Sequence, residues 1–338
     1  MTNTYVSSMA LSGWRRTLQS MDRGADGVCA PMLAKIDKMI ADNPEKVRLD
    51  DYVRLLEEIG RSCKSSSLAW AAGHAVDLPF DKMFSTAIRG CKSLGTSLQW
   101  LCQYFALLQD ASILRLDVAE DWTTLSYKIL DPEIWPRHED AMYTLGIFSR
   151  LIKAAAPESW SQVQISVESE PDQVKVDLGS IVQTNVIFGA SANSIRMPTA
   201  IINAPVTTAK PCDPDVLKKL ATELTKKRRL MPVSERTRRV IYREMNDGCV
   251  NQEYIARELG ISSRTLRRRL SLENQSFQQL LDECRMQFAA LEFRTRSRMS
   301  LSDMALKLGY SEHSTFSRAF ARWAGMAPQE YRRTVAMH

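Results

Sequence analysis

The sequence lacks the features of a secreted, membrane-spanning or zinc-bound chain. Its seven cysteines are scattered, odd in number and never spaced as Cys-x-x-Cys, which predicts neither a disulfide framework nor a zinc knuckle. No apolar run is long enough to span a bilayer. The N-terminus has no basic cluster followed by an apolar stretch, as a secretory signal would. We therefore expect reduced thiols, a cytoplasmic location and no membrane partner.

Motifs of catalysis are also missing. The sequence contains no glycine-rich phosphate loop, no His-Glu-x-x-His, no Gly-x-Ser-x-Gly and no Cys/His cluster with metal-ligand spacing. We predict no catalytic residue, no cofactor and no metal site. A binding protein is therefore favoured over an enzyme.

Acidic residues are scarce in the C-terminal third. The net charge of the whole chain is +6, but residues 226–338 hold 22 Lys and Arg against 12 Asp and Glu, and the remainder holds 23 against 27. Nearly all basic residues of this third are arginines, whose planar guanidinium can bond two acceptors at once. Such a module fits a nucleic-acid partner, although a solvated basic surface would give the same count.

Length and hydrophobic periodicity predict two domains with different folds. A chain of 338 residues suggests two domains of ordinary size. In the first, helical spacing of apolar residues precedes alternating stretches, which predicts an α+β domain with a small antiparallel sheet. Its helices are expected at 31–43, 50–64, 68–74, 97–108 and 137–156, and its strands at 113–118, 124–129, 162–167, 185–188 and 194–197.

The domain boundaries follow from the same pattern. Residues 1–30 show no firm pattern, and part of this segment is expected to be mobile. The α+β domain is expected at 31–205, and a linker with a helix at 206–233, where prolines cluster near its start. Residues 234–338 are expected to be all-α. The seven helices of this part are expected at about 234–246, 251–259, 262–271, 276–296, 301–308, 311–323 and 328–333.

Two segments of the C-terminal part share one sequence pattern. In the first, a helix over 252–259 is followed by Gly260, and Ser262 stands at an N-cap position. Leu266 and Leu270 follow with i, i+4 spacing, which anchors one face of the next helix in a core. Helix, glycine turn and helix is the helix-turn-helix arrangement of DNA-binding proteins.

The second segment repeats this pattern further along the chain. Gly309 follows a short helix over 302–308, and Ser311 stands at the expected N-cap. Phe316 and Phe320 take the two anchor positions. The sequence therefore predicts a second helix-turn-helix unit.

Donor side chains occupy the helix faces opposite these anchors. At 3.6 residues per turn, positions two away from an anchor point the opposite way. These positions and their neighbours are Arg264, Arg267, Arg268, Ser314, Ser317 and Arg318. Because a helix fits the major groove, where arginine can bond two acceptors of guanine, both helices are predicted to read bases.

A fixed spacing of small, aromatic and basic residues runs through the second unit. It consists of Leu301-Ser302-Asp303-Met304-Ala305, Leu308-Gly309-Tyr310-Ser311-Glu312, Ser314-Thr315-Phe316-Ser317-Arg318-Ala319-Phe320-Ala321-Arg322-Trp323, Gly325-Met326-Ala327-Pro328 and Tyr331-Arg332. With this motif, residues 234–333 resemble the DNA-binding domain of the AraC/XylS family of bacterial transcription regulators. Two positions depart from the family pattern: Ala327 replaces the usual Ser or Thr, and Ala321 a common basic residue.

The resemblance implies two helix-turn-helix units, at about 251–271 and 301–323, joined by a long helix at 276–296. It implies base contacts from Arg264, Thr265, Arg267, Arg268, His313, Ser314, Ser317 and Arg318. The face argument selects nearly the same set, and His313 qualifies only through its place in the first turn. Arg269 is expected at a phosphate or on the surface. One such domain should cover roughly two helical turns of DNA, in successive major grooves about 34 Å apart.

The N-terminal part carries a second resemblance. Its cues are Leu94-Gly95-Thr96-Ser97-Leu98, the hairpin at 113–129 and Val186-Ile187-Phe188-Gly189-Ala190 with Asn193–Pro198. Most of residues 31–205 resemble the "arabinose-binding"-type N-terminal domain of AraC relatives such as the ornithine-utilisation regulators. This implies sensing of a small-molecule effector, with a homodimer as a further option. The domain name does not establish arabinose as the ligand.

The sequence leaves the effector-binding residues unidentified. Six side chains could line a cavity, although aromatics at helical spacing are more often plain core. They are Trp100, Tyr104, Trp135, His138, Tyr143 and Phe148. Of these, His138 lies beside two acidic residues and is expected to be a solvated surface histidine.

Two functions remain. The first is a transcription regulator that binds double-stranded promoter DNA, responds to an effector and acts as an activator with RNA polymerase at the nucleoid. The second is a constitutive DNA-binding regulator whose N-terminal domain only dimerises. A fused DNA-repair methyltransferase would need a reactive cysteine in a Pro-Cys-His-Arg setting, and Pro211-Cys212-Asp213 in the linker does not provide one.

Overall fold

The structure is a computed structural model of the 338-residue chain. It describes residues 4–22, 29–63, 65, 67–76, 91–131, 133–169, 178–205, 214–245, 250–294 and 299–336. The chain divides into two compact units, Met1–Ile129 with Ile134–Leu224, and Leu130–Glu133 with Thr225–His338. Within the described ranges, no helix combines the length and the apolar character needed to cross a membrane.

The first unit contains a five-stranded sheet in the order β3-β4-β7-β5-β6. Its strands are β3 (Ser112–Val118), β4 (Trp122–Ile129), β5 (Gln164–Ser166), β6 (Asn185–Ile187) and β7 (Asn193–Pro198). The predicted hairpin is confirmed, since β3 and β4 pair antiparallel with Leu116 opposite Leu125. The expectation of a wholly antiparallel sheet is wrong for β5 and β6, which pair in parallel. The connection between them contains α8 (Leu178–Val182) and is long enough for the crossover that parallel strands require.

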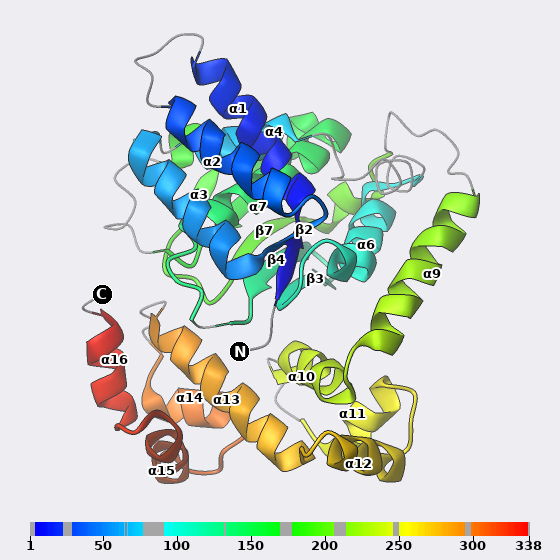
Figure 1. Ribbon diagram of the computed structural model, residues 1–338, viewed down its shortest axis with the longest axis vertical. Helices are drawn as coiled ribbons and strands as arrows, with labels where there is room; N and C mark the ends of the chain where they lie inside the picture. Colours follow the sequence, from blue (N-terminus) through cyan, green and yellow to red (C-terminus); the bar gives the residue numbers. More distant parts are fainter. Residues whose placement is uncertain are drawn as a thin grey trace. The chain divides into compact units, whose positions relative to one another are not determined.

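Helices pack outward from this sheet in successive layers (Figure 1). The unit contains α1 (Ser12–Asp22), α2 (Cys29–Asp42), α3 (Leu49–Cys63), α4 (Leu68–Ala75), α6 (Leu94–Tyr104) and α7 (His138–Ala155), with short 3-10 turns η1 (Ser8–Leu11), η2 (Phe105–Leu107), η3 (Pro157–Gln162) and η5 (Thr199–Asn203). α7 contacts β7, α3 and α4 contact α7, and α1 contacts α4. α4 and α7 cross closely because Gly73 and Gly146 meet there; a Cβ on Gly73 would lie 2.3 Å from the carbonyl oxygen of Tyr143.

Residues 4–22 depart from the sequence-based expectation. β1 (Tyr5–Ser7) pairs antiparallel with β2 (Lys46–Arg48), and α1 follows the turn η1. Leu11, Trp14 and Leu18 are completely buried in the core of the unit. This segment is therefore part of the folded unit rather than a mobile extension.

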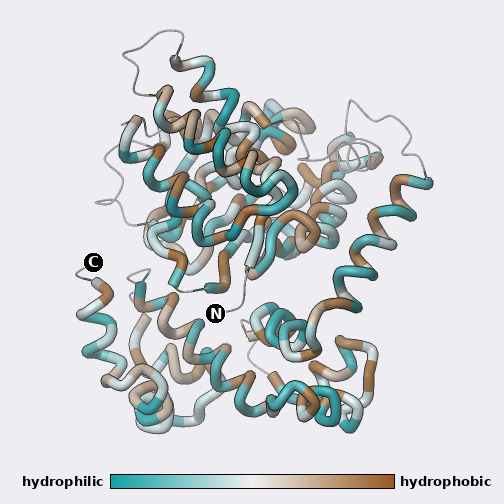
Figure 2. The backbone as a smooth tube through the Cα atoms, viewed as in Figure 1, coloured by the Kyte–Doolittle hydropathy of each residue, from teal (hydrophilic) through white to brown (hydrophobic). Residues whose placement is uncertain are grey.

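The predicted linker falls partly outside the described residues. Residues 206–213, including Cys212, are not described, whereas the helix expected after them is present as α9 (Pro214–Leu230). Hydrophobic and hydrophilic residues alternate along α9 (Figure 2), as expected for an amphipathic helix. Its Leu220 and Leu224 are buried against the core of the first unit.

The second unit is all-helical over its described residues, and the seven predicted helices are confirmed. They are α10 (Val233–Glu244), α11 (Gln252–Glu258), α12 (Ser263–Leu272), α13 (Phe277–Arg294), α14 (Leu301–Lys307), α15 (His313–Ala324) and α16 (Pro328–Ala336). The 18 residues of α13 span about 27 Å at 1.5 Å per residue. Within the unit, α10 to α12 lie near one end of α13, and α14 to α16 near the other (Figure 1).

Candidate nucleic-acid interface

The first helix-turn-helix unit consists of α11 and α12, held against α10. Leu266 and Leu270 of α12 are completely buried, as their i, i+4 spacing predicts. The Oγ atom of Ser262 accepts a hydrogen bond from the N–H of Thr265 at 3.1 Å, so the predicted N-cap is confirmed. After α12, the carboxylate of Glu273 accepts bonds from the backbone N–H groups of Val233 (2.7 Å) and Ser234 at the start of α10. These contacts fix the position of α12 within the unit.

The turn between α11 and α12 depends on Gly260. Gly260 has φ +69°, a left-handed conformation that glycine adopts without strain. Its N–H donates to the carbonyl of Arg257 at 2.9 Å, and the N–H of Ile261 donates to that of Ala256 at 3.0 Å. This is the Schellman pattern of a helix C-terminus. Apart from the two neighbouring residues of the chain, no atom lies within 4 Å of the position that a Cβ on Gly260 would take. The positive φ angle, and not a lack of space, is therefore what requires glycine here.

The turn between α14 and α15 has the same geometry. Gly309 has φ +77°, and its N–H donates to the carbonyl of Leu306 at 2.9 Å. The N–H of Tyr310 donates to the carbonyl of Ala305 at 2.9 Å. The turns of the two helix-turn-helix units therefore have the same backbone conformation and hydrogen bonds, as the repeated sequence pattern predicts.

Aromatic packing anchors α15. Phe316 and Phe320 are completely buried, as predicted. The ring of Phe320 lies edge-on to Phe293 of α13 at 5.4 Å and to Tyr331 of α16 at 5.3 Å between centroids. Edge-to-face pairs of this kind are among the preferred aromatic geometries. The second recognition-type helix is thus fixed to α13, the same helix against which α10 packs.

The predicted N-cap of α15 is wrong. The helix begins at His313, its N-cap position is Glu312, and no side chain caps it. Glu312 has extended backbone, and its Oε2 accepts a hydrogen bond from the Oγ of Ser314 at 3.1 Å. A local bond between side chains has replaced the hydroxyl cap expected from Ser311.

The outer face of α12 presents arginines with no internal partner. Arg264, Arg267, Arg268 and Arg269 are all exposed, and none makes a hydrogen bond or ion pair with any described residue. The arginines of α10 differ: the Arg238 guanidinium, for example, pairs with Glu283 at 2.8 Å. Unpaired guanidinium groups on a rigid helix are free to bond an external acceptor such as a base edge or a phosphate.

The outer face of α15 is more mixed in chemistry. His313, Ser314 and Arg318 are exposed and Ser317 is half-buried. A guanidinium nitrogen of Arg318 donates to the Oγ1 of Thr315 at 3.4 Å, a long bond that external acceptors can replace. The structure thus places all eight predicted contact residues on α12 and α15, with the greater positive charge on α12.

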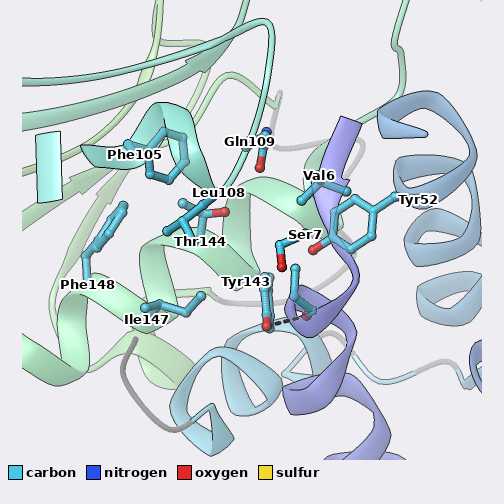
Figure 3. A pocket seen from close by; sticks show the side chains of 11 residues that line it. Val6, Ser7, Tyr52, Phe105, Leu108, Gln109, Tyr143, Thr144, Ile147 and Phe148 are labelled. Carbon is cyan, nitrogen blue, oxygen red and sulfur yellow. Dashed lines mark hydrogen bonds between the residues drawn. The ribbon is translucent and has the colours of Figure 1, made fainter. Parts of the chain in front are cut away.

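The first unit contains a cavity between β1, α3 and α7 (Figure 3). It is small and partly open to solvent: the space that a water-sized molecule can occupy is about 20 Å³, room for about one water. The described lining residues are Val6, Ser7, Ala10, Tyr52, Phe105, Leu108, Gln109, Tyr143, Thr144, Ile147 and Phe148. The contributions of β1, α3 and the segment after α6 were not predicted, because elements distant in the sequence meet only in the folded chain.

Of the six aromatic candidates from the sequence, only Tyr143 and Phe148 line this cavity. Trp100 stacks on Tyr104 at 5.0 Å elsewhere in the unit. The expectation that His138 is a solvated surface residue is wrong. It is partly buried, its Nδ1 lies 2.7 Å from the Oγ of Ser169, and burial lowers its pKa to about 4.

Comparison with known proteins follows the division of the chain. A family model described as "Helix-turn-helix domain" matches residues 255–334. A second, described as "Arabinose-binding domain of AraC transcription regulator, N-term", matches residues 30–206. Together they cover the first unit from residue 30 to residue 206, and both helix-turn-helix units except the first three residues of α11.

Curated relatives are transcription regulators from bacteria. The ornithine utilization regulator of Pseudomonas aeruginosa is 25% identical over 313 residues, which is 88% of this chain and 88% of that protein. The regulator VirS of Mycobacterium tuberculosis is 32% identical over 150 residues, 44% of this chain and 43% of its own. The regulator GadX of Escherichia coli K12 is 39% identical over 82 residues, 24% and 30% of the two chains. The chain belongs to the AraC family of transcription regulators and is a DNA-binding regulator with an arabinose-binding-type N-terminal domain.

Proposed function

We propose that the protein reads promoter DNA through both helix-turn-helix units at once. In this proposal, Arg264, Thr265, Arg267 and Arg268 contact bases from α12, and His313, Ser314, Ser317 and Arg318 contact bases from α15. The observation that carries it is the exposed, unpaired arginine face of α12 on a helix whose opposite face is completely buried. Such a helix meets the groove in one orientation, because its buried face cannot rotate outward.

The two helices contribute differently to recognition in this proposal. The arginines of α12 suit guanine, which offers two acceptors to one guanidinium in the major groove. The exposed serine, histidine and single arginine of α15 suit a mixed sequence. Arg269, beside this set, contacts a phosphate and adds affinity without base preference.

The N-terminal unit controls this binding in response to a small-molecule effector, and the protein acts as an activator in contact with RNA polymerase. The match to an arabinose-binding-type domain supports effector control. The proposed sensing domain begins at β1 rather than at residue 31, since β1 and α1 belong to the same core. The DNA-binding domain starts at about residue 234, after a linker over 206–233.

The alternative is a constitutive DNA-binding protein whose N-terminal unit serves only to form a homodimer. The comparison of DNA affinity with and without cell metabolites separates the two, because only effector control predicts a change. A change in sedimentation with protein concentration would report dimer formation in either case.

Selection of duplexes from a random library by the full chain tests the DNA-binding proposal. We expect enrichment of a two-part motif, with guanines in one part where α12 binds. Enrichment no greater than that given by a variant with Arg264, Arg267 and Arg268 all replaced by alanine would overturn it. Circular dichroism of the variant checks that α12 remains folded.

A further inference from the structure

The C-terminal end of α9 carries a run of basic residues. Residues 225–230, Thr-Lys-Lys-Arg-Arg-Leu, hold four basic residues and no acidic one, and they belong to the second unit. Building on the DNA reading by α12 proposed above, we infer that Lys226 and Arg229 bind the phosphate backbone of the same DNA, beside the groove that α12 occupies. These two side chains add affinity without base preference.

Lys226 and Arg229 form one exposed face at this end of α9. They are three residues apart, so their side chains project from the same side of the helix. Both are exposed, and neither makes a hydrogen bond or an ion pair with any described residue. Glu223, one turn earlier, is also exposed and pairs with neither of them. Among the described residues, nothing neutralises the charge of this face.

The arginines of α10, the next helix, differ in this respect. All four have partners within the second unit. Arg239, for example, pairs with Glu235 at 3.3 Å. Lys226 and Arg229 instead resemble the arginines of α12, which are exposed and unpaired. A cation without an internal partner is available to a phosphate, for which lysine and arginine are common ligands.

Two hydrogen bonds hold the chain that follows α9 against the end of the recognition helix α12. Only two residues separate α9 from α10 (Figure 1). The backbone N–H groups of Val233 and Ser234, at the start of α10, donate to the carboxylate of Glu273 at 2.7 and 2.9 Å. Glu273 lies directly after α12 and four residues beyond Arg269, so the two side chains are on the same side of the helix. The start of α10 is therefore attached on the Arg269 side of α12.

The reach of the basic face follows from the length of chain between it and this attachment. Arg229 precedes Val233 by four residues, which span at most about 14 Å when fully extended. Lys226 lies about 4.5 Å further back along α9. The major groove is about 12 Å wide, with a phosphate chain along each edge. When α12 occupies the groove, the strand on the Arg269 side is therefore within reach of both side chains.

A purely structural role for the same residues makes a different prediction. Basic residues at the C-terminal end of a helix interact favourably with the helix dipole. If this were their whole role, their removal would lower the melting temperature and leave the salt dependence of DNA binding unchanged. Phosphate contact predicts the opposite, because each contact releases counterions from the DNA and makes affinity depend on salt.

The salt dependence of DNA affinity in the full chain tests the inference. Fluorescence anisotropy with a selected duplex and with a random duplex, at about 50 to 200 mM salt, compares the wild type with Lys226→Gln/Arg229→Gln. Each phosphate contact contributes about 0.9 to the slope of log affinity against log salt, so the slope should be smaller by about 1.8 in the variant. Over this fourfold range, the wild type should lose roughly 12-fold more affinity than the variant. An unchanged slope would overturn the inference.

Two further variants serve as controls. Lys218→Gln/Lys219→Gln changes the net charge equally on the same helix, at exposed and unpaired residues that belong to the first unit. It should keep the wild-type slope, and an equal reduction in both double variants would contradict the assignment. Lys226→Arg/Arg229→Lys keeps both charges and should also keep the slope. A slope as low as that of the glutamine variant would show that these side chains do not contact phosphate.

The same measurements distinguish this inference from the proposed base reading. If the wild type does not prefer the selected duplex over the random one, base reading fails, while a difference in slope still assigns phosphate contact to α9. If the preference is found and the slope does not change, base reading stands and the phosphate contact of α9 is wrong.

Discussion

Replacement of Arg268 by alanine should weaken DNA binding at one base pair only. Arg268 is exposed and makes no hydrogen bond or ion pair with any described residue, so its removal costs the free protein little stability. The loss should therefore appear almost entirely in the complex. One arginine contact to guanine contributes about 1–3 kcal/mol, or roughly a 5- to 150-fold loss of affinity.

Arg269→Ala provides the matched control. Arg269 is the next residue of α12 and is equally exposed and unpaired, but it is expected at a phosphate. Its removal should weaken binding to all duplexes alike and reduce the slope of log affinity against log salt by about 1.

Fluorescence anisotropy with the selected duplex and its single-base variants measures both effects. In Arg268→Ala, one position should lose its base preference while the others keep theirs. The reasoning is refuted if Arg268→Ala binds every duplex as the wild type does, or if its loss is uniform across duplexes like that of Arg269→Ala.

Three further predictions concern stability. Gly260→Ala should lower the free energy of unfolding by about 1–2 kcal/mol, and Gly260→Asn should lower it by less, because the angle φ +69° is the only obstacle to another residue and asparagine tolerates it better than alanine. Equal losses of the two variants in urea denaturation would contradict this. Gly73→Ala should lower the free energy of unfolding by about 1–3 kcal/mol or more, because the added Cβ would meet backbone atoms of α7. An unchanged melting temperature would show that α4 and α7 are not in close contact. Burial, with Glu57 beside it, raises the pKa of Glu139 to about 8. As the pH rises, the Glu139 carboxyl therefore ionises in the unfolded chain before it ionises in the folded chain. The free energy of unfolding should consequently fall between about pH 4.5 and pH 8. In Glu139→Gln, the fall in the free energy of unfolding between pH 5 and pH 8, measured by denaturation, should be smaller by roughly 1–3 kcal/mol. The same pH dependence in the variant and in the wild type would show that Glu139 is not the group that titrates.

The helices of the second unit could be predicted because local signals agree there. Gly260 and Gly309 mark turns that only a left-handed residue completes, and the spacing of Leu266 with Leu270 fixes the buried face of the helix that follows. Each of these signals acts within one or two turns of helix. The prediction that Ser311 caps α15 was wrong: the helix begins after Glu312, whose carboxylate accepts a hydrogen bond from the hydroxyl of Ser314.

The structure of the first unit was harder to predict from the sequence, because it depends on contacts between residues far apart in the chain. Trp14 and Leu18 lie on one face of α1, but the helix is short and most of its other residues are polar or glycine. Its burial therefore depends on the contacts with α2 and α4. The parallel pairing of β5 with β6 likewise has no local signal. The cavity combines residues from Val6 to Phe148, and no sequence period connects them.

The spacing between the two halves of the selected DNA site tests the central claim that one chain reads two grooves from one rigid frame. α15 packs on α13 directly and α12 is joined to α13 through α10, so we expect the distance between the two recognition helices not to follow a change in the DNA. We predict that inserting about 5 or about 10 base pairs between the half-sites, half or one helical turn, reduces affinity to that of a single half-site. Full affinity for either spaced duplex would contradict the account.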